Sequence, residues 1–273
     1  MENLVLEQKQ CLIAGDGQLP VEMAKSSKQN GFEVVCVSLS SDNIKELKKH
    51  CSKVVSYGPG QIDSIKKFLI EENVKQLTFL GKVSKTMLVK RPKLEKTAIS
   101  LLKEMKKLND DAIMLKIVEQ LENIGVTILD QTIFIKNLMI QKGVLTKNAP
   151  TELEMADVDY GFNIAKQIGG LDIGQSVVMK DRMIMAVEAI EGTDRCIKRG
   201  CKLAKRKNAI VVKVSKPLQD KRFDIPTVGL RTIKTMRKYG AKVLALESGE
   251  TIIVERDKMV EYANKHNIII VAV

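Results

Sequence analysis

The hydrophobic positions of the first 130 residues fall into short apolar runs separated by stretches of helical length. The apolar runs lie at 11–15, 32–39, 53–58 and 74–81, and the helical stretches between them lie at 19–30 and 62–72. Strands this apolar, alternating with helices, are typical of a parallel sheet covered on both faces. Two more helices are expected at 92–108, from apolar residues three and four apart, and at 110–124, where Gly125 follows the last turn.

After residue 130 the periodicity weakens, and the segment 141–153 carries the Gly, Asn and Pro residues of a linker. Beyond it, 155–168 has helical spacing, 176–190 alternates as a hairpin that turns near Lys180 and Asp181, and 209–215 is a buried strand. The sequence therefore predicts an α/β protein of two domains. We expect a Rossmann-like parallel sheet that binds nucleotide or lipid at 1–140, a linker at 141–153 and a mixed α/β catalytic domain at 154–273.

Composition limits the class of protein. The hydrophobic content of 44% and the charged content of 29% are those of a globular chain. No apolar run reaches the roughly 18 residues that a membrane-spanning helix needs. Residues 1–10 lack the basic start and apolar stretch of a signal peptide. We therefore expect a cytoplasmic protein.

The net charge of +12 favours anionic partners. Aromatic residues make up only 4% of the chain and tryptophan is absent, so the sequence gives little support for base stacking and we expect no nucleic acid partner. A peripheral contact with an anionic membrane surface is an expectation, and a homodimer is compatible with the sequence. Five cysteines without a C-x-x-C pair and two widely separated histidines argue against a zinc site.

Reactive side chains are most concentrated between Glu188 and Thr227. Five carboxylates and five cations lie in this turn-rich segment: Glu188, Glu191, Asp194, Asp220 and Asp224 beside Arg195, Lys213, Lys216, Lys221 and Arg222. Carboxylate oxygens suit Mg²⁺, and lysine and arginine neutralise the phosphate oxygens that carry charge in a transition state. The segment is therefore typical of a magnesium-dependent phosphate site, although a salt-bridged surface loop would have the same composition.

A second group of candidates follows two strands of the N-terminal sheet. The first strand leads into a helix through Gly15, Asp16 and Gly17, and the fourth strand is followed by Lys82, Val83 and Ser84. Free amides at a helix start favour an anion, and ligands of α/β proteins collect at the carboxyl edge of the sheet. A dinucleotide fingerprint would need a glycine where this chain has Pro20, which weakens the case for a nicotinamide-dependent oxidoreductase. A tight turn that needs glycine for its geometry alone is the alternative for the first loop.

Two aspartates, Asp110 and Asp111, open the second long helix of this half. One of them is expected to cap the helix and interact with its dipole. The other is a candidate ligand for a base or ribose.

Several segments resemble one enzyme family in register along nearly the whole chain. They are LIAGDGQLP (12–20), GKVSK (81–85), NDDAIM (109–114), the segment 155–178, MAVEAIEGTDR (185–195) and VVKVSKPLQDKRFDIPTVG (211–229). The family is that of the UDP-2,3-diacylglucosamine pyrophosphatases of lipid A biosynthesis, in the branch without a histidine-rich dimetal site. The resemblance implies a Mg²⁺-dependent hydrolase of two α/β domains. In it, water attacks the uridine-side phosphorus and gives UMP and 2,3-diacylglucosamine 1-phosphate (lipid X).

The resemblance further implies that Asp224 is essential to catalysis, because it occupies the family's FDIPT position. Together with local composition it assigns catalysis to Asp224, Lys213 and Asp194, and Mg²⁺ binding to Asp224, Glu191 and Asp194. The predicted substrate-binding residues are Gly15, Asp16, Gly17, Lys82, Val83, Ser84, Asp110, Asp111, Glu188, Gly192, Thr193, Lys216 and Arg222. A regulatory protein that binds a nucleotide or phosphate without turnover is the alternative function.

Overall fold

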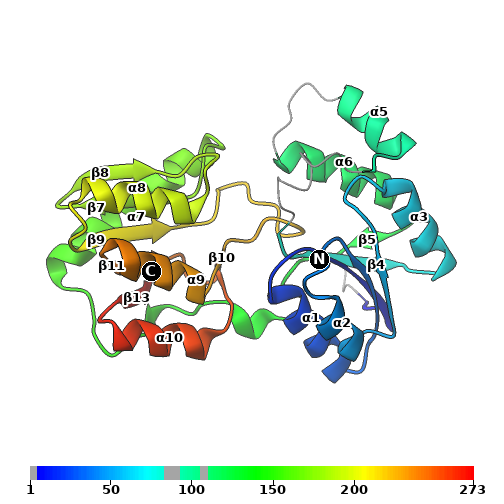
Figure 1. The fold of residues 1–273 in the computed structure, drawn as a ribbon, viewed down its shortest axis with the longest axis horizontal. Helices are drawn as coiled ribbons and strands as arrows, with labels where there is room; N and C mark the ends of the chain where they lie inside the picture. Colours follow the sequence, from blue (N-terminus) through cyan, green and yellow to red (C-terminus); the bar gives the residue numbers. More distant parts are fainter. Residues whose placement is uncertain (1–4, 83–92, 105–109) are drawn as a thin grey trace. The chain divides into compact units, whose positions relative to one another are not determined.

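The structure, a computed structural model, describes residues 5–82, 93–104 and 110–273. It confirms an α/β protein of two compact units (Figure 1). Unit 1 comprises residues 1–135 together with 221–224, and unit 2 comprises 136–220 and 225–273. Within the described residues, no helix is both long and apolar enough to cross a membrane.

Unit 1 is built on a five-stranded parallel sheet in the order β3-β2-β1-β4-β5. Its strands are β1 (Lys9–Ala14), β2 (Glu33–Ser38), β3 (Lys53–Ser56), β4 (Gln76–Leu80) and β5 (Thr127–Ile128). The chain moves outward from β1 to β3 and then returns to place β4 on the other side of β1. The strand order therefore changes direction between β1 and β4, and α/β proteins bind ligands at the carboxyl ends of strands at such a point.

Helices cover both faces of this sheet. They are α1 (Leu19–Gln29), α2 (Ile44–His50), α3 (Ile62–Glu71) and α6 (Asp110–Glu122), whereas α5 (Lys96–Glu104) packs against α3. One face forms a core with α3 and α6, in which Leu69, Leu77 and Leu121 are fully buried. Helices α1 and α2 pack against each other and contact β1, β2 and β3. Pro92 and residues 105–108 of the expected helix 92–108 lie outside the described residues.

A reciprocal pair of carboxylates joins α3 to α5. Asp63 accepts hydrogen bonds from the Thr97 backbone amide (3.1 Å) and hydroxyl, and Glu95 accepts them from the Ser64 amide (2.8 Å) and hydroxyl. Each carboxylate thus accepts from a backbone amide in the first turn of the other helix, where the amide has no backbone partner. These bonds hold the pKa of both carboxyl groups below the ordinary value, the larger contribution coming from the hydroxyls.

Residues 221–224 come from the C-terminal half of the sequence but belong to unit 1. The Lys221 carbonyl accepts a hydrogen bond from the Gln131 amide (2.9 Å), and Arg222 forms an ion pair with Glu122 at the end of α6 (3.0 Å). Phe223 packs against the core between the sheet and α3 and α6. The short segment is therefore an integral part of the unit 1 fold.

Unit 2 is built on a six-stranded mixed sheet in the order β6-β13-β11-β9-β7-β8. Its strands are β6 (Gly143–Val144), β7 (Ser176–Lys180), β8 (Met183–Val187), β9 (Ala209–Lys213), β11 (Ala241–Leu246) and β13 (Ile269–Ala272). β9, β11 and β13 are parallel, and β6, β7 and β8 add antiparallel pairs at the two sides. β10 (Thr227–Val228) and β12 (Ile252–Ile253) form a separate two-stranded parallel sheet.

Apolar residues alternate between the two faces of the six-stranded sheet. Ile210 and Val212 of β9 pack with α7 (Glu152–Gly170), whereas Ala209 and Val211 pack on the opposite face. That opposite layer contains α8 (Thr193–Leu203), α9 (Leu230–Tyr239) and α10 (Arg256–Lys265) (Figure 1). Unit 2 is therefore a three-layer α/β/α structure.

The expected hairpin is formed by β7 and β8, which turn through Asp181 and Arg182 with positive φ angles of 50° and 59°. Two such residues are typical of the turn that matches strand twist. The expected linker, 141–153, contains elements of unit 2: β6 pairs with β13, and Thr151 caps α7 in a reciprocal bond with Glu154. The 3₁₀ helix η1 (Lys136–Leu138) is the first element of this unit.

Candidate active site

The glycine loop after β1 is joined to the loop after β4 in unit 1. The Asp16 amide donates to the Lys82 carbonyl (2.7 Å) and the Lys82 amide donates to the Asp16 carbonyl (3.1 Å). A Cβ atom on Gly15 would lie 2.6 Å from the Lys82 carbonyl oxygen, and one on Gly81, where φ is +91°, would lie 2.7 Å from that of Asp16. Both glycines are therefore required by this close approach of two backbones.

The first turn of α1 has amides available to an anion. Gly17, Gln18 and Leu19 precede the first backbone hydrogen bond of the helix, and within the described residues their amides have no partner. Pro20 occupies the second helical position, where no amide is needed. Asn43, which sequence reasoning missed, donates its side-chain amide to the Gly17 carbonyl and so fixes this loop. Its position after β2 was an available signal, because β2 ends at the same edge.

Four predicted binding residues of unit 1 lie wholly or partly outside the described residues. Val83 and Ser84 lie outside the described residues. Asp110 and Asp111 are the first two residues of α6, as expected, but their side chains also lie outside the description.

Unit 2 brings together three of the predicted residues in one hydrogen-bonded chain. The Lys213 ammonium donates to the Thr193 hydroxyl oxygen (3.1 Å), and that hydroxyl donates to Glu188 Oε1 (3.0 Å). Lys213 also donates to the Thr227 carbonyl (3.4 Å). Because lysine only donates and an ionised carboxylate only accepts, the hydroxyl proton of Thr193 points to Glu188. We name Glu188, Thr193 and Lys213 the lysine cluster.

Local structure explains how these residues meet. Lys213 is the last residue of β9, Glu188 follows β8 directly, and both strands flank β7. Gly192, with φ of +80°, precedes α8 and turns Thr193 into the first helical position. Gly174 is required beside this point, because a Cβ atom there would lie 2.1 Å from the Glu188 carbonyl oxygen.

The two charged members of the lysine cluster are buried, and Thr193 is half-buried. Lys213 is 7% exposed and Glu188 is 8% exposed, and within the described residues Glu188 Oε2 has no hydrogen-bond partner. Burial and the Glu188 carboxylate together raise the pKa of the adjacent Cys196 thiol to about 12, burial having the larger effect. A buried ammonium at a strand end can neutralise a phosphate more strongly than one in water.

Three other predicted residues of unit 2 are held in separate ion pairs. Glu191 pairs with Arg199, Asp194 pairs with Arg231 (2.8 Å), and Lys216 pairs with Asp172 (2.8 Å). The Arg199 guanidinium is the main cause that lowers the pKa of the Glu191 carboxyl. Within the described residues, no group of three His, Cys, Asp or Glu side chains is placed to hold a metal ion. The predicted set Asp224, Glu191 and Asp194 is not assembled within either unit.

Asp224 and Arg222 belong to the unit 1 segment 221–224. Arg222 forms the ion pair with Glu122, and the half-buried Asp224 is the last residue of the segment. The proposed catalytic aspartate is thus fixed by the unit 1 core through its neighbour Phe223.

A polar cluster that sequence reasoning missed lies beside Lys213. Glu247 accepts hydrogen bonds from the Ser215 amide (2.7 Å) and hydroxyl (2.9 Å) and pairs with Lys166 of α7 (2.9 Å). The Glu247 amide also donates to the Lys213 carbonyl (3.3 Å). The available signal was that Glu247 and Ser215 each follow a buried strand.

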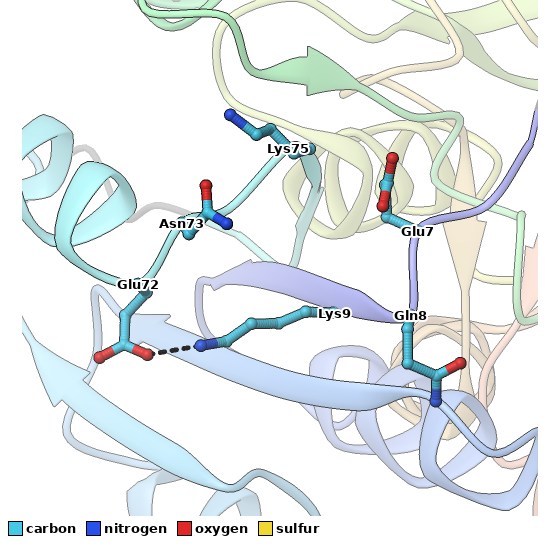
Figure 2. Close-up of a pocket in the computed structure, with 6 residues that line it drawn as sticks. All are labelled: Glu7, Gln8, Lys9, Glu72, Asn73 and Lys75. Carbon is cyan, nitrogen blue, oxygen red and sulfur yellow. Dashed lines mark hydrogen bonds and ion pairs between the residues drawn. The ribbon is translucent and has the colours of Figure 1, made fainter.

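A hollow elsewhere on unit 1 is lined by Glu7, Gln8, Lys9, Glu72, Asn73 and Lys75. Figure 2 shows that Lys9 reaches across it to Glu72, with which it forms an ion pair of 2.7 Å. β1 and β4 begin here, so the hollow lies at the amino edge of the sheet, opposite the glycine loop. It contains none of the residues predicted for the site.

The solved structures compared with this chain resemble it only weakly. Among solved structures, a UDP-glucose 4-epimerase from Thermotoga maritima with UDP-glucose is 12% identical, with a TM-score of 0.30 over 52% of this chain and 41% of that one. An N5-carboxyaminoimidazole synthetase from Staphylococcus aureus complexed with ADP is 16% identical, with a TM-score of 0.26 over 74% and 46% of the two chains. Scores this low support no statement about fold or function.

Similarity in sequence is far more extensive. Residues 9–138 match the family model described as the LpxI N-terminal domain, and residues 141–271 match the LpxI C-terminal domain. The UDP-2,3-diacylglucosamine pyrophosphatase LpxI of Caulobacter vibrioides is 30% identical over 272 residues, which cover 96% of each chain. The chain belongs to the LpxI family.

Proposed function

We propose that this protein hydrolyses the pyrophosphate bond of UDP-2,3-diacylglucosamine to UMP and 2,3-diacylglucosamine 1-phosphate. The observation that carries the proposal is the full-length match to the Caulobacter vibrioides enzyme of that name. The buried lysine cluster supports it, because a diphosphate needs cationic groups that neutralise charge at the reacting phosphorus.

In the proposed reaction, water attacks the uridine-side phosphorus. A bond forms from the water oxygen to that phosphorus, and its bond to the bridging oxygen breaks. The leaving lipid phosphate keeps the bridging oxygen and its electron pair, and the water loses a proton. We assign the Lys213 ammonium to charge neutralisation on the diphosphate and Asp224 to orienting the water and accepting its proton.

Mg²⁺ is the proposed cofactor. It commonly binds through one or two protein carboxylates, with substrate phosphates and water completing the octahedron. Glu191 and Asp194 are each paired with an arginine in this structure, so either carboxylate would have to release its arginine before it could bind the ion. We propose that Asp224 and the diphosphate oxygens hold the ion, whose contribution when bound is to neutralise phosphate charge.

The test is UMP release from UDP-2,3-diacylglucosamine, followed chromatographically. We expect release with Mg²⁺, none with excess EDTA, and a loss of at least about a hundredfold in kcat for Asp224→Asn and for Lys213→Met. Hydrolysis in ¹⁸O-labelled water should place the label in UMP. Mn²⁺ binding followed by electron paramagnetic resonance in the presence of UMP gives a metal readout that does not depend on turnover.

Two outcomes would count against this function. Unchanged turnover of a folded Asp224→Asn variant would remove its assigned role. Tight binding of UMP without any release from the lipid substrate would favour the regulatory alternative, since the amides of Gly17, Gln18 and Leu19 suit a phosphate in either case.

We further propose that the enzyme acts in the cytoplasm, at the surface of an anionic membrane that contains its substrate.

A further inference from the structure

The positive charge of this protein is concentrated in two short segments of unit 2. Residues 193–207 and 230–239 contain eleven lysines and arginines and a single acidic residue, Asp194. These 25 residues therefore carry a net charge of +10, whereas the whole chain carries +12. The rest of the molecule is close to electrically balanced.

The two segments form one surface. Helices α8 and α9 lie next to each other on the same face of the six-stranded sheet (Figure 1). Their apolar residues point into the core, where Ile197, Cys201, Ile233 and Met236 are fully buried. All eleven cations are exposed: Arg195, Lys198, Arg199, Lys202, Lys205, Arg206, Lys207, Arg231, Lys234, Arg237 and Lys238. We name this surface the basic face.

Most of its charge is available to a partner. Arg199 pairs with Glu191 and Arg231 pairs with Asp194. Four others lie over tyrosine rings: Arg206 and Lys238 over Tyr239, and Lys234 and Arg237 over Tyr262. The remaining five have no carboxylate within 4 Å among the described residues: Arg195, Lys198, Lys202, Lys205 and Lys207.

The neighbouring helices show that the charge is not spread evenly over unit 2. α10, in the same layer, has three cations and two carboxylates. α7, on the other face of the sheet, has four carboxylates and one lysine. Unit 2 is therefore polarised, with its positive side on α8 and α9.

We propose that the basic face is the surface by which this protein docks on an anionic lipid bilayer. Clustered lysines and arginines bind anionic headgroups, and each adds to the attraction. Leu203, 61% exposed, stands between Lys202 and Lys205 as an apolar side chain suited to the headgroup boundary. The two tyrosines are already covered by cations, so the face has no free ring on which a nucleic acid base could stack.

The inference rests on the proposed function only for its choice of a lipid surface, since a substrate with two acyl chains is held in a membrane. α8 also links the face to the site. Its first residue is Thr193 of the lysine cluster, and its eleven residues span about 16 Å. Docking through α8 would therefore hold the lysine cluster within one helix length of the headgroups.

The test compares two double variants with the same change in net charge. Lys198→Ala with Lys202→Ala removes charge from α8, and Lys45→Ala with Lys48→Ala removes it from the exposed side of α2 in unit 1. Binding is measured by co-sedimentation with vesicles of phosphatidylcholine containing about one-third phosphatidylglycerol, without substrate. We expect the α8 variant to bind at least about tenfold more weakly than wild type, and the α2 variant to stay within about twofold. Pure phosphatidylcholine vesicles and high salt should abolish binding.

Several results would overturn the proposal. One is wild-type binding that does not depend on anionic lipid, and another is an equal effect of the two double variants. Tighter binding to an RNA or DNA duplex than to vesicles, lost selectively in the α8 variant, would make nucleic acid the partner instead. Turnover of detergent-dispersed substrate should be unchanged in the α8 variant. A failure of UMP release with intact vesicle binding would refute the proposed function and leave the docking surface standing.

Discussion

Replacing Lys213 by methionine tests whether the lysine cluster is one interacting unit. Lys213 and Glu188 are both more than nine-tenths buried, and they are connected through the Thr193 hydroxyl rather than by direct contact. The exchange removes donors to Thr193 and to a backbone carbonyl, each of which contributes about 1.5–3 kcal/mol when the donor is charged. It also removes the ammonium that is linked through Thr193 to the buried Glu188 carboxylate. Against this, methionine packs well in a dry site, so we expect a net loss of about 2–4 kcal/mol in the free energy of unfolding.

The decisive quantity is the coupling between this change and Glu188→Gln. Glutamine keeps an oxygen that can accept from Thr193, so the single variant mainly removes the negative charge that faces the buried ammonium through the Thr193 hydroxyl. In the double variant neither charge is present, and the desolvation cost of both disappears. The double variant should therefore be more stable than the sum of the single effects predicts, by about 1–2 kcal/mol.

Denaturant unfolding provides the assay. Far-ultraviolet circular dichroism follows both units, and tyrosine fluorescence reports mainly on unit 2, because three of the four tyrosines (160, 239 and 262) lie there. Coincident transitions would justify a two-state treatment. Effects that add to within about 0.5 kcal/mol would refute the interpretation, since independent sites behave in that way.

Three further predictions follow from other parts of the structure. Gly15→Ala should lower the free energy of unfolding by about 1–3 kcal/mol and weaken UMP binding measured by calorimetry, since its Cβ atom would meet the Lys82 carbonyl; unchanged UMP affinity would contradict this. Cys51 should be alkylated by iodoacetamide before the other four cysteines, as judged by mass spectrometry, because a hydrogen bond from Cys36 lowers the pKa of its half-buried thiol and favours the thiolate. The lowered pKa of Asp63 means that its stabilising effect is full above its unfolded pKa of about 4 and is lost as the pH falls through the folded value. Hydrogen exchange, corrected for intrinsic rates, should therefore show less protection of α5 at pH 3 than at pH 6, and equal protection would count against the pairing.

The apolar runs were sufficient to predict the sheet of unit 1, because its central strands are buried on both faces. Residues 11–14 of β1 are all buried, for example, so the run is apolar at every position. Helix α2 was not predicted. It has seven residues and a single buried one, Leu47, which is too little for a recognisable period.

The candidate site, too, could be predicted only in part from the sequence. Glu188, Thr193 and Lys213 lie in one turn-rich stretch of sequence. Local composition singled out Glu188 and Lys213, and the family resemblance added Thr193. Ser215 and Glu247 each follow a buried strand, but their contact with Lys166 depends on how β9, β11 and α7 pack together, which local sequence does not show. The arginine partners of Glu191 and Asp194 were not predicted either, because ion pairs depend on where side chains lie in the folded structure.

The segment 221–224 makes unit 1 discontinuous in the sequence. The two family models divide it near residue 140, yet Phe223 completes the core of unit 1 from beyond that point. A fragment that ends near residue 140 would lack the Phe223 packing, the Arg222 ion pair and the Lys221 hydrogen bond. The complementary fragment would contain Asp224 without the core that holds it. Unit 1 can therefore be completed only after most of unit 2 has been synthesised, and we expect the proposed hydrolysis to need both units in one continuous chain.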